Sequence, residues 1–102
     1  MKTLTRVLSV VVLIMTGNVA LARDIPDAEA QRLQAAGTIQ SWERLNAEAL
    51  STHPGATITD TELKNEYGKY MYQVELRDTN GVDWDLEIDA VTGQVYKNHQ
   101  DK

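Results

Sequence analysis

The stretch Val82–Gly93, "VDWDLEIDAVTG", decides the fold that the sequence predicts. In its first eight residues apolar and acidic side chains alternate, which is the period of a β-strand with one buried and one solvated face. The apolar set is Val82, Trp84, Leu86 and Ile88, and the acidic set is Asp83, Asp85, Glu87 and Asp89. The remaining residues indicate a turn, in which Asp89 accepts backbone hydrogen bonds and Gly93 takes a positive φ.

The preceding segment, Tyr70–Arg77, alternates in the same way and predicts a hairpin with residues 82–89. A two-residue turn at Asn80-Gly81 would place Leu76 opposite Asp85 and so put an acid among core residues. A three-residue loop at 79–81 avoids this conflict and gives Gly81 the left-handed position that such loops need. The pairs expected in this register are Leu76–Trp84, Val74–Leu86 and Tyr72–Ile88 on the core face, and Arg77–Asp83 and Glu75–Asp85 on the wet face, where Met71 and Gln73 also belong.

Two helices are expected before the strands. Pro26 suits the opening turn of a short helix over about 26–36, and Gly37 follows as a stop signal. Ser41 is the expected N-cap of a main helix over about 41–51, which ends before Pro54. Its apolar stripe consists of Trp42, Leu45, Ala49 and Leu50.

The strands fill the rest of the chain, from about residue 56 to 98. The phase of residues 56–63 leaves two alternatives, because Ile58 and Leu63 differ by an odd number. Either a bulge separates them or one of the two points outward. Residues 94–98 form a short last strand. The expected fold class is α+β, with one or two N-terminal helices packed on one face of a small antiparallel sheet of three to four strands.

The first 22 residues have the three parts of a secretory signal peptide. Lys2 and Arg6 form a basic start, residues 7–15 are apolar apart from Ser9, and Ala20-Leu21-Ala22 matches the A-x-A motif before a cleavage site. The apolar run is shorter than the roughly 20 residues of a membrane-spanning helix. We therefore expect cleavage near Ala22, a periplasmic or secreted location, no membrane span in the mature chain, and one domain over residues 23–102.

The expected mature chain is acidic and contains no cysteine. The sequence holds ten basic and fifteen acidic residues, and loss of the leader removes two of the basic ones, so the net charge changes from −5 to −7. Nucleic acid and anionic lipid need a basic surface, so neither is an expected partner. Without a disulfide, stability depends on a modest hydrophobic core.

The sequence contains no motif of catalysis or cofactor binding. His53 and His99 are the only histidines, and neither stands in a motif with a serine and an acid. No glycine-rich phosphate loop or H-E-x-x-H pattern occurs. Adjacent acids on one face of a strand are roughly 7 Å apart, too far to wrap a calcium ion, and only Glu75 opposite Asp85 could form a two-acid clamp. We expect no enzymatic activity, no cofactor and no metal site.

The acidic face of the predicted sheet is the candidate partner-facing surface. Its residues are Glu75, Asp83, Asp85 and Glu87. Such a row attracts a basic protein, and the attraction weakens with salt. A sheet edge offers a second route, by adding a strand from an extended peptide. The plainer alternative is a solvated face that serves solubility.

Two quoted segments resemble the PepSY domain: "YQVEL" (Tyr72–Leu76) and, after a glycine turn, "WDLEIDAVTGQV" (Trp84–Val95). In that family an aromatic-x-Val-Glu strand is followed by a strand ending in Asp-Ala-x-Thr-Gly-x-Val. The helix that runs into "HPGATIT" also fits, and "AQRLQAAGTIQSWERL" is similar to small exported PepSY proteins with a short leading helix. The resemblance covers most of residues 27–97. The matching motif residues are Tyr72, Val74, Asp89 and Gly93, all of which we interpret as structural.

The resemblance implies a compact α+β unit and a non-enzymatic role. PepSY domains occur in propeptides of thermolysin-like peptidases and in cell-envelope proteins, and are proposed to inhibit or regulate peptidases. Because the sequence shows no peptidase domain, a partner in trans is expected. The predicted function is an exported binding module that modulates or inhibits a peptidase or another envelope protein, such as a sensor. The alternatives are a periplasmic divalent-cation-binding protein and a purely structural accessory domain.

Overall fold

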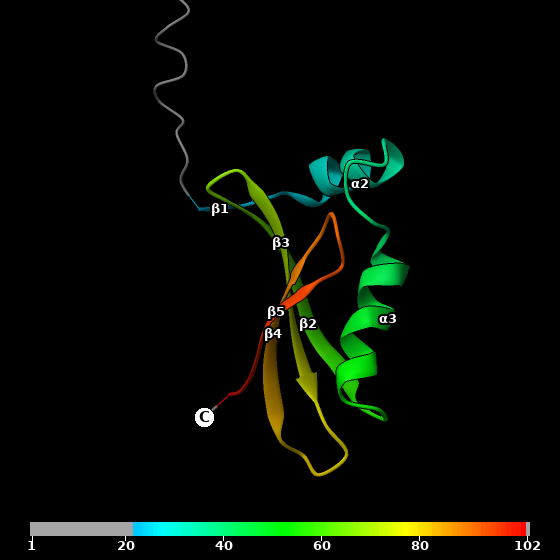
Figure 1. The fold of residues 1–102 in the computed structure, drawn as a ribbon, viewed down its shortest axis with the longest axis vertical. Helices are drawn as coiled ribbons and strands as arrows, with labels where there is room; N and C mark the ends of the chain where they lie inside the picture. Colours follow the sequence, from blue (N-terminus) through cyan, green and yellow to red (C-terminus); the bar gives the residue numbers. More distant parts are fainter. Residues whose placement is uncertain (1–21, 102) are drawn as a thin grey trace, which may run out of the picture.

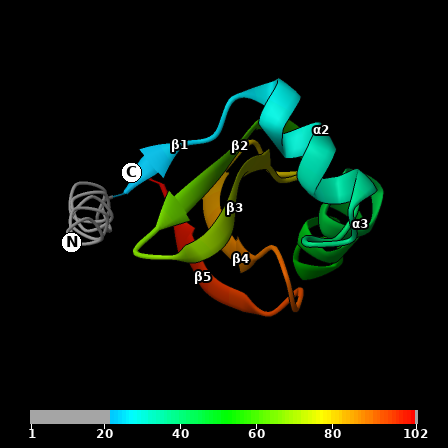
Figure 2. The same cartoon turned by 90° about the horizontal axis from the view of Figure 1, so that it is seen from above.

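The computed structural model describes residues 22–101, so the predicted leader lies outside the described residues apart from Ala22. The elements are β1 (Arg23–Asp24), α2 (Asp27–Ala35), α3 (Trp42–Thr52), β2 (Thr57–Glu66), β3 (Lys69–Arg77), β4 (Asp83–Asp89) and β5 (Val95–Gln100). The strands form one antiparallel sheet in the order β1-β2-β3-β4-β5. Both helices lie on the same face of this sheet, as Figures 1 and 2 show from two directions. We call the other side the open face, because no described element packs on it.

The sheet has five strands, so the expected number of three to four was wrong. The additional strand is β1, which pairs Arg23 with Asn65 and Asp24 with Lys64. A strand of two residues has no alternation, so no sequence period could reveal it. It is anchored by Ile25, which is buried and whose N–H donates to the Leu63 carbonyl at 2.9 Å.

The two helices bury unequal amounts of apolar surface. In α2, which begins after Pro26, only Ala30 is fully buried, so this helix contributes little to the core. Ser41 caps α3 as predicted, because its Oγ accepts the Arg44 N–H at 3.2 Å. Leu45 and Ala49 on α3 are completely buried against the sheet. The main helix therefore supplies most of the cover for the helix-facing side.

The register of the β3–β4 hairpin is the one that the three-residue loop predicted. Leu76 pairs with Trp84, and Glu75 pairs with Asp85. Asp78 donates its N–H to the Val82 carbonyl at 2.8 Å, and Gly81 has a φ of +81°. The alternation of the sequence was enough to fix this register, since a shift of one residue would have exchanged the two faces.

A β-bulge in β2 resolves the ambiguous phase of residues 56–63. The register shifts between Ile58 and Asp60, which leaves Thr59 as the extra residue. Ile58 and Leu63 consequently both contact the core. Of the two alternatives that the sequence left open, the structure has the bulge.

The core lies between α3 and the central strands and is built around Tyr72. The Tyr72 ring is stacked on the Trp42 ring with their centroids 4.7 Å apart, and the Tyr72 hydroxyl donates to Asn46 Oδ1 at 2.7 Å. Burial raises the pKa of Tyr72, which therefore stays protonated and available as a donor. Trp84 is only half-buried, beside His53, and its indole N–H donates to Asp78 Oδ2.

Met71 departs from the pattern expected for its face. The alternation places it on the wet side with Gln73 and Glu75, yet it is only 4% exposed. Its cross-strand partners on that face are Lys64 and Asp89. The open face is thus not solvated along its whole length, and its wet part lies farther along β3, toward Glu75.

Candidate functional site

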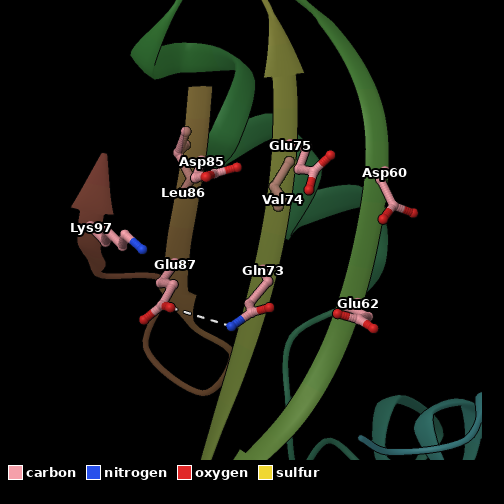
Figure 3. A pocket seen from close by; sticks show the side chains of 9 residues that line it. All are labelled: Asp60, Glu62, Gln73, Val74, Glu75, Asp85, Leu86, Glu87 and Lys97. Carbon is pink, nitrogen blue, oxygen red and sulfur yellow. Dashed lines mark hydrogen bonds between the residues drawn. The ribbon is translucent and has the colours of Figure 1, made fainter. Parts of the chain in front are cut away.

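The charged side chains of the open face form two rows that cross the sheet (Figure 3). The strand register determines both rows. The first row contains Asp60, Glu75, Asp85 and His99, and the second contains Glu62, Gln73, Glu87 and Lys97. Three carboxylates therefore stand next to one another on β2, β3 and β4 in the first row. In each row the only residue with a basic side chain lies on β5: His99 in the first row and Lys97 in the second.

The two rows surround a shallow hollow of about 150 Å³. Five carboxylates line it, together with Gln73, Lys97, Val74 and Leu86. The lining side chains come from β2, β3, β4 and β5 and are drawn in Figure 3. Gln73 Nε2 donates to Glu87 Oε2 at 3.3 Å, which orients one of the five acids. We call this region the acidic hollow and define it by Asp60, Glu62, Glu75, Asp85 and Glu87.

Glu75 occupies the centre of the first row, and the pKa of its carboxyl group is shifted. Its pKa is raised, first by partial loss of hydration and then by the negative charges of Asp85 and Asp60. Like charges directly opposite one another in a sheet are destabilising. The first row therefore costs stability in the free chain, and no lysine or arginine stands within that row.

Asp83 lies outside the acidic hollow, although the sequence grouped it with the other three acids. Arg77 donates to it twice, from Nε to Oδ1 at 2.9 Å and from Nη2 to Oδ2 at 3.3 Å. This pairing lowers the pKa of Asp83 and satisfies its charge within the chain. The structure thus brings together Glu75, Asp85 and Glu87, and separates Asp83 from them.

Sequence reasoning missed Asp60, Glu62 and Lys97, which complete the hollow. A signal for the first two was present. Glu62 and Asp60 lie one and three residues before Leu63, an apolar residue of the core face, so alternation from Leu63 places both on the open face. The competing phase of Ile58, which the bulge at Thr59 explains, obscured this signal. Lys97 required knowledge of the β4–β5 register, which shifts between Glu87 and Ile88.

The β4–β5 turn is built by the remaining motif residues. Asp89 is 5% exposed, and its Oδ1 accepts the N–H groups of Val91 at 2.8 Å and Thr92 at 3.1 Å. Gly93 has a φ of +84°, and a Cβ there would lie 3.3 Å from Gln40 Nε2. These contacts give both residues a structural task away from the acidic hollow.

Two kinds of feature are absent from residues 22–101. Within that range no group of three or more His, Asp and Glu side chains is arranged to hold a metal ion. Over the same residues, no helix is both long enough and apolar enough to cross a membrane.

Comparison with known proteins gives one family match. The PepSY family, described as "Peptidase propeptide and YPEB domain", matches residues 33–98. Searches of curated proteins and of solved structures returned no significant match. The family match spans α3, β2, β3, β4 and the first four residues of β5, and thus every residue of the acidic hollow. It extends over well more than half of the 102 residues, and the chain therefore belongs to the PepSY family.

Proposed function

We propose that this protein is an exported, non-enzymatic binding module that regulates a peptidase or another protein of the cell envelope. The observation that carries the proposal is the Asp60–Glu75–Asp85 row on a sheet face that no described element covers. The family description, which names peptidase propeptides, supports a peptidase as the class of partner. The acidic hollow is the proposed contact surface.

The row favours binding over a purely structural role because it opposes folding. The core lies on the opposite side of the sheet and makes no use of these carboxylates. A cationic partner would remove the repulsion around Glu75, so complex formation would relieve a cost that the free chain carries. The partner is expected to present lysine or arginine side chains, and its binding should weaken as salt rises.

Export is part of the proposal and has a direct test. The basic start, the apolar run and the A-x-A motif support a cleaved leader. N-terminal sequencing of the protein from a periplasmic or secreted fraction should begin at Arg23. Recovery of the uncleaved chain from the cytoplasm would contradict this part of the proposal and leave the binding surface open to separate testing.

The binding proposal is tested with two variants of equal charge change. Glu75→Gln/Asp85→Asn neutralises the centre of the acidic row, whereas Glu43→Gln/Glu48→Gln removes two exposed acids from α3. The immobilised mature chain should capture an envelope protein at low salt and release it at high salt. Capture should be lost in the first variant and kept in the second, with circular dichroism confirming both folds.

A captured peptidase is then assayed with and without the mature chain. We expect its activity to change with added chain, and the change to be absent with Glu75→Gln/Asp85→Asn. Equal capture by both variants would exclude the acidic hollow as the contact surface. Absence of any captured protein would instead favour an accessory structural domain.

A further inference from the structure

The tip of the β2–β3 hairpin has a residue other than glycine with a positive φ, which occurs nowhere else in residues 22–101. Within residues 22–101 six residues have a positive φ, and five of them are glycines: Gly37, Gly55, Gly68, Gly81 and Gly93. The sixth is Tyr67, with a φ of +55°. A bulky residue in the left-handed region is strained and is seldom kept there without a compensating role.

No packing compensates for the strain at Tyr67. Its side chain is 74% exposed, more than any other large apolar side chain in the described part of the protein. Tyr67 and Gly68 are the two central residues of a two-residue hairpin turn, since Glu66 pairs with Lys69. Such turns favour Asn-Gly, so asparagine would fit this position with less strain than tyrosine.

The hairpin holds this tyrosine in a fixed position. Gly68 donates its N–H to Asn65 Oδ1 at 2.9 Å, which closes the turn. Asn65 also pairs with Arg23 of β1, so β2 has a strand on both sides just before the tip. In Figure 2 the tip points away from α2 and α3. A side chain on so rigid a support loses little conformational freedom when it is bound.

We propose that Tyr67 is an anchor residue that inserts into an apolar pocket of the protein partner, with a polar group there for its hydroxyl. The proposal rests on the proposed function, in that it assumes a protein partner, and it adds a second contact. Tyrosine is enriched among residues that dominate binding energy at protein interfaces. The flanking Glu66 and Lys69 cancel in charge and the chain as a whole is acidic, which disfavours an anionic membrane surface as the target.

The anchor is distinct from the acidic hollow. Tyr67 stands at one end of the β2–β3 hairpin, whereas Glu75 lies eight positions farther along the chain, toward the other end of β3. Lys69 stands between them on β3, with its ammonium group 4.9 Å from the centre of the Tyr96 ring. The two contacts can therefore be altered independently.

Photocrosslinking in cells that export the protein gives the first test. A benzophenone amino acid is placed at Tyr67, at Glu62 in the acidic hollow, and at Asn80 in the exposed β3–β4 loop as a matched control. Irradiation should yield a covalent adduct with an envelope protein from position 67 and none from position 80. A lipid or glycan adduct, or no adduct, at position 67 overturns the anchor. Adducts from position 62 report on the proposed function separately.

The second test titrates the partner protein identified by crosslinking, once it is purified, with the mature chain. Tyr67→Asn should raise the Kd of the complex at least tenfold, because the anchor is lost. The same variant should unfold at a higher temperature than the natural chain, because the backbone strain at position 67 is relieved. Tyr67→Phe should weaken binding less than Tyr67→Asn, because it keeps the ring and loses only the hydroxyl contact. An unchanged Kd for Tyr67→Asn overturns the anchor, and if Glu75→Gln/Asp85→Asn still weakens binding, the proposed function stands without it. Weakening by Tyr67→Asn alone would support the anchor and reject the acidic hollow.

Discussion

The two faces of β3 differ in how well their residues suit one another. On the helix-facing side Tyr72, Val74 and Leu76 are each 2% exposed or less. On the open face Glu75 lies between two other carboxylates, at a position where an opposite charge would stabilise the sheet. The helix-facing residues of β3 therefore stabilise the fold, whereas the position of Glu75 on the open face lowers its stability.

The unfavourable charges are confined to the middle of the open face. At one end Arg77 pairs with Asp83, and at the other Lys69 Nζ lies 3.9 Å from Asp89 Oδ2. Opposite charges thus meet at both ends, while the acidic hollow between them holds five carboxylates and a single lysine. This contrast within one face is the reason for proposing a binding surface at the acidic hollow.

The largest expected effect comes from the helix-facing side. Leu76 is completely buried, so Leu76→Ala should lower the free energy of unfolding by about 2–5 kcal/mol through lost burial and the cavity that remains. In a small chain without disulfides this is a large part of the total stability. Urea unfolding followed by circular dichroism measures the change. The control is Gln73→Ala on the open face, for which a shift beyond about 0.5 kcal/mol would contradict the contrast between the faces.

The next effect concerns Asp89, a carboxylate buried at the margin of the open face. Asp89→Ala leaves the N–H groups of Val91 and Thr92 without their acceptor, so we expect a loss of about 1–3 kcal/mol. Asp89→Asn keeps an acceptor oxygen and should be milder. Equal losses for the two variants would show that the negative charge of Asp89, rather than its role in the turn, supports the fold.

A smaller effect is expected from the hydroxyl of Tyr72. Tyr72→Phe keeps the stacking on Trp42 but removes the donor to Asn46 Oδ1, which should cost about 1 kcal/mol. Thermal unfolding of the variant measures this loss. Tyr70→Phe, on the same strand and only partly buried, is the control and should leave the midpoint almost unchanged. An unchanged unfolding midpoint for Tyr72→Phe would mean that water takes the place of the hydroxyl as the donor to Asn46 Oδ1.

Sequence reasoning worked where periodicity and turn chemistry agree. The alternation in Tyr70–Arg77 and Val82–Asp89, with Gly81 between them, predicted the register of the central hairpin. It failed for features that depend on contacts between distant segments. The strand β1 depends on Ile25 reaching Leu63, and the burial of Met71 on the open face depends on neighbours contributed by other strands.

The candidate site was predicted only in its β3 and β4 part for the same reason. Glu75, Asp85 and Glu87 follow from alternation, whereas the face of Asp60 and Glu62 follows only if Leu63 rather than Ile58 sets the phase of β2, which the bulge at Thr59 decides. Separation of Asp83 from the site depends on the rotamer of Arg77, which donates two hydrogen bonds to it. The hairpin register had predicted that Arg77 faces Asp83, but the side-chain geometry that satisfies the charge of Asp83 does not follow from alternation.

The smallest effect reports, through pH, on the cost of charging Glu75, to which loss of hydration contributes first and repulsion within the acidic row second. The raised pKa of Glu75 means that the folded chain holds this proton to higher pH than the unfolded chain, whose carboxyl titrates near 4.5. Stability should therefore fall as pH rises from about 4.5 through the folded pKa of Glu75. Glu75→Gln cannot ionise, so it should be more stable than the natural chain at pH 7, by less than about 1 kcal/mol, and lose this advantage near pH 4.

The opposite sign is expected for Asp83, which makes it the internal control. Its pKa is lowered by Arg77, so its contribution is present above the unfolded value of 3.8 and is lost as pH falls through the lower folded value. Urea unfolding of the natural chain, Glu75→Gln and Asp83→Asn at pH 7, 4 and 2.5 separates the two. At pH 7 Asp83→Asn should be the less stable variant, and its difference from the natural chain should shrink only at pH 2.5. If Glu75→Gln is no more stable than the natural chain at pH 7, the row carries no repulsion, and the physical reason for assigning it to a cationic partner is removed.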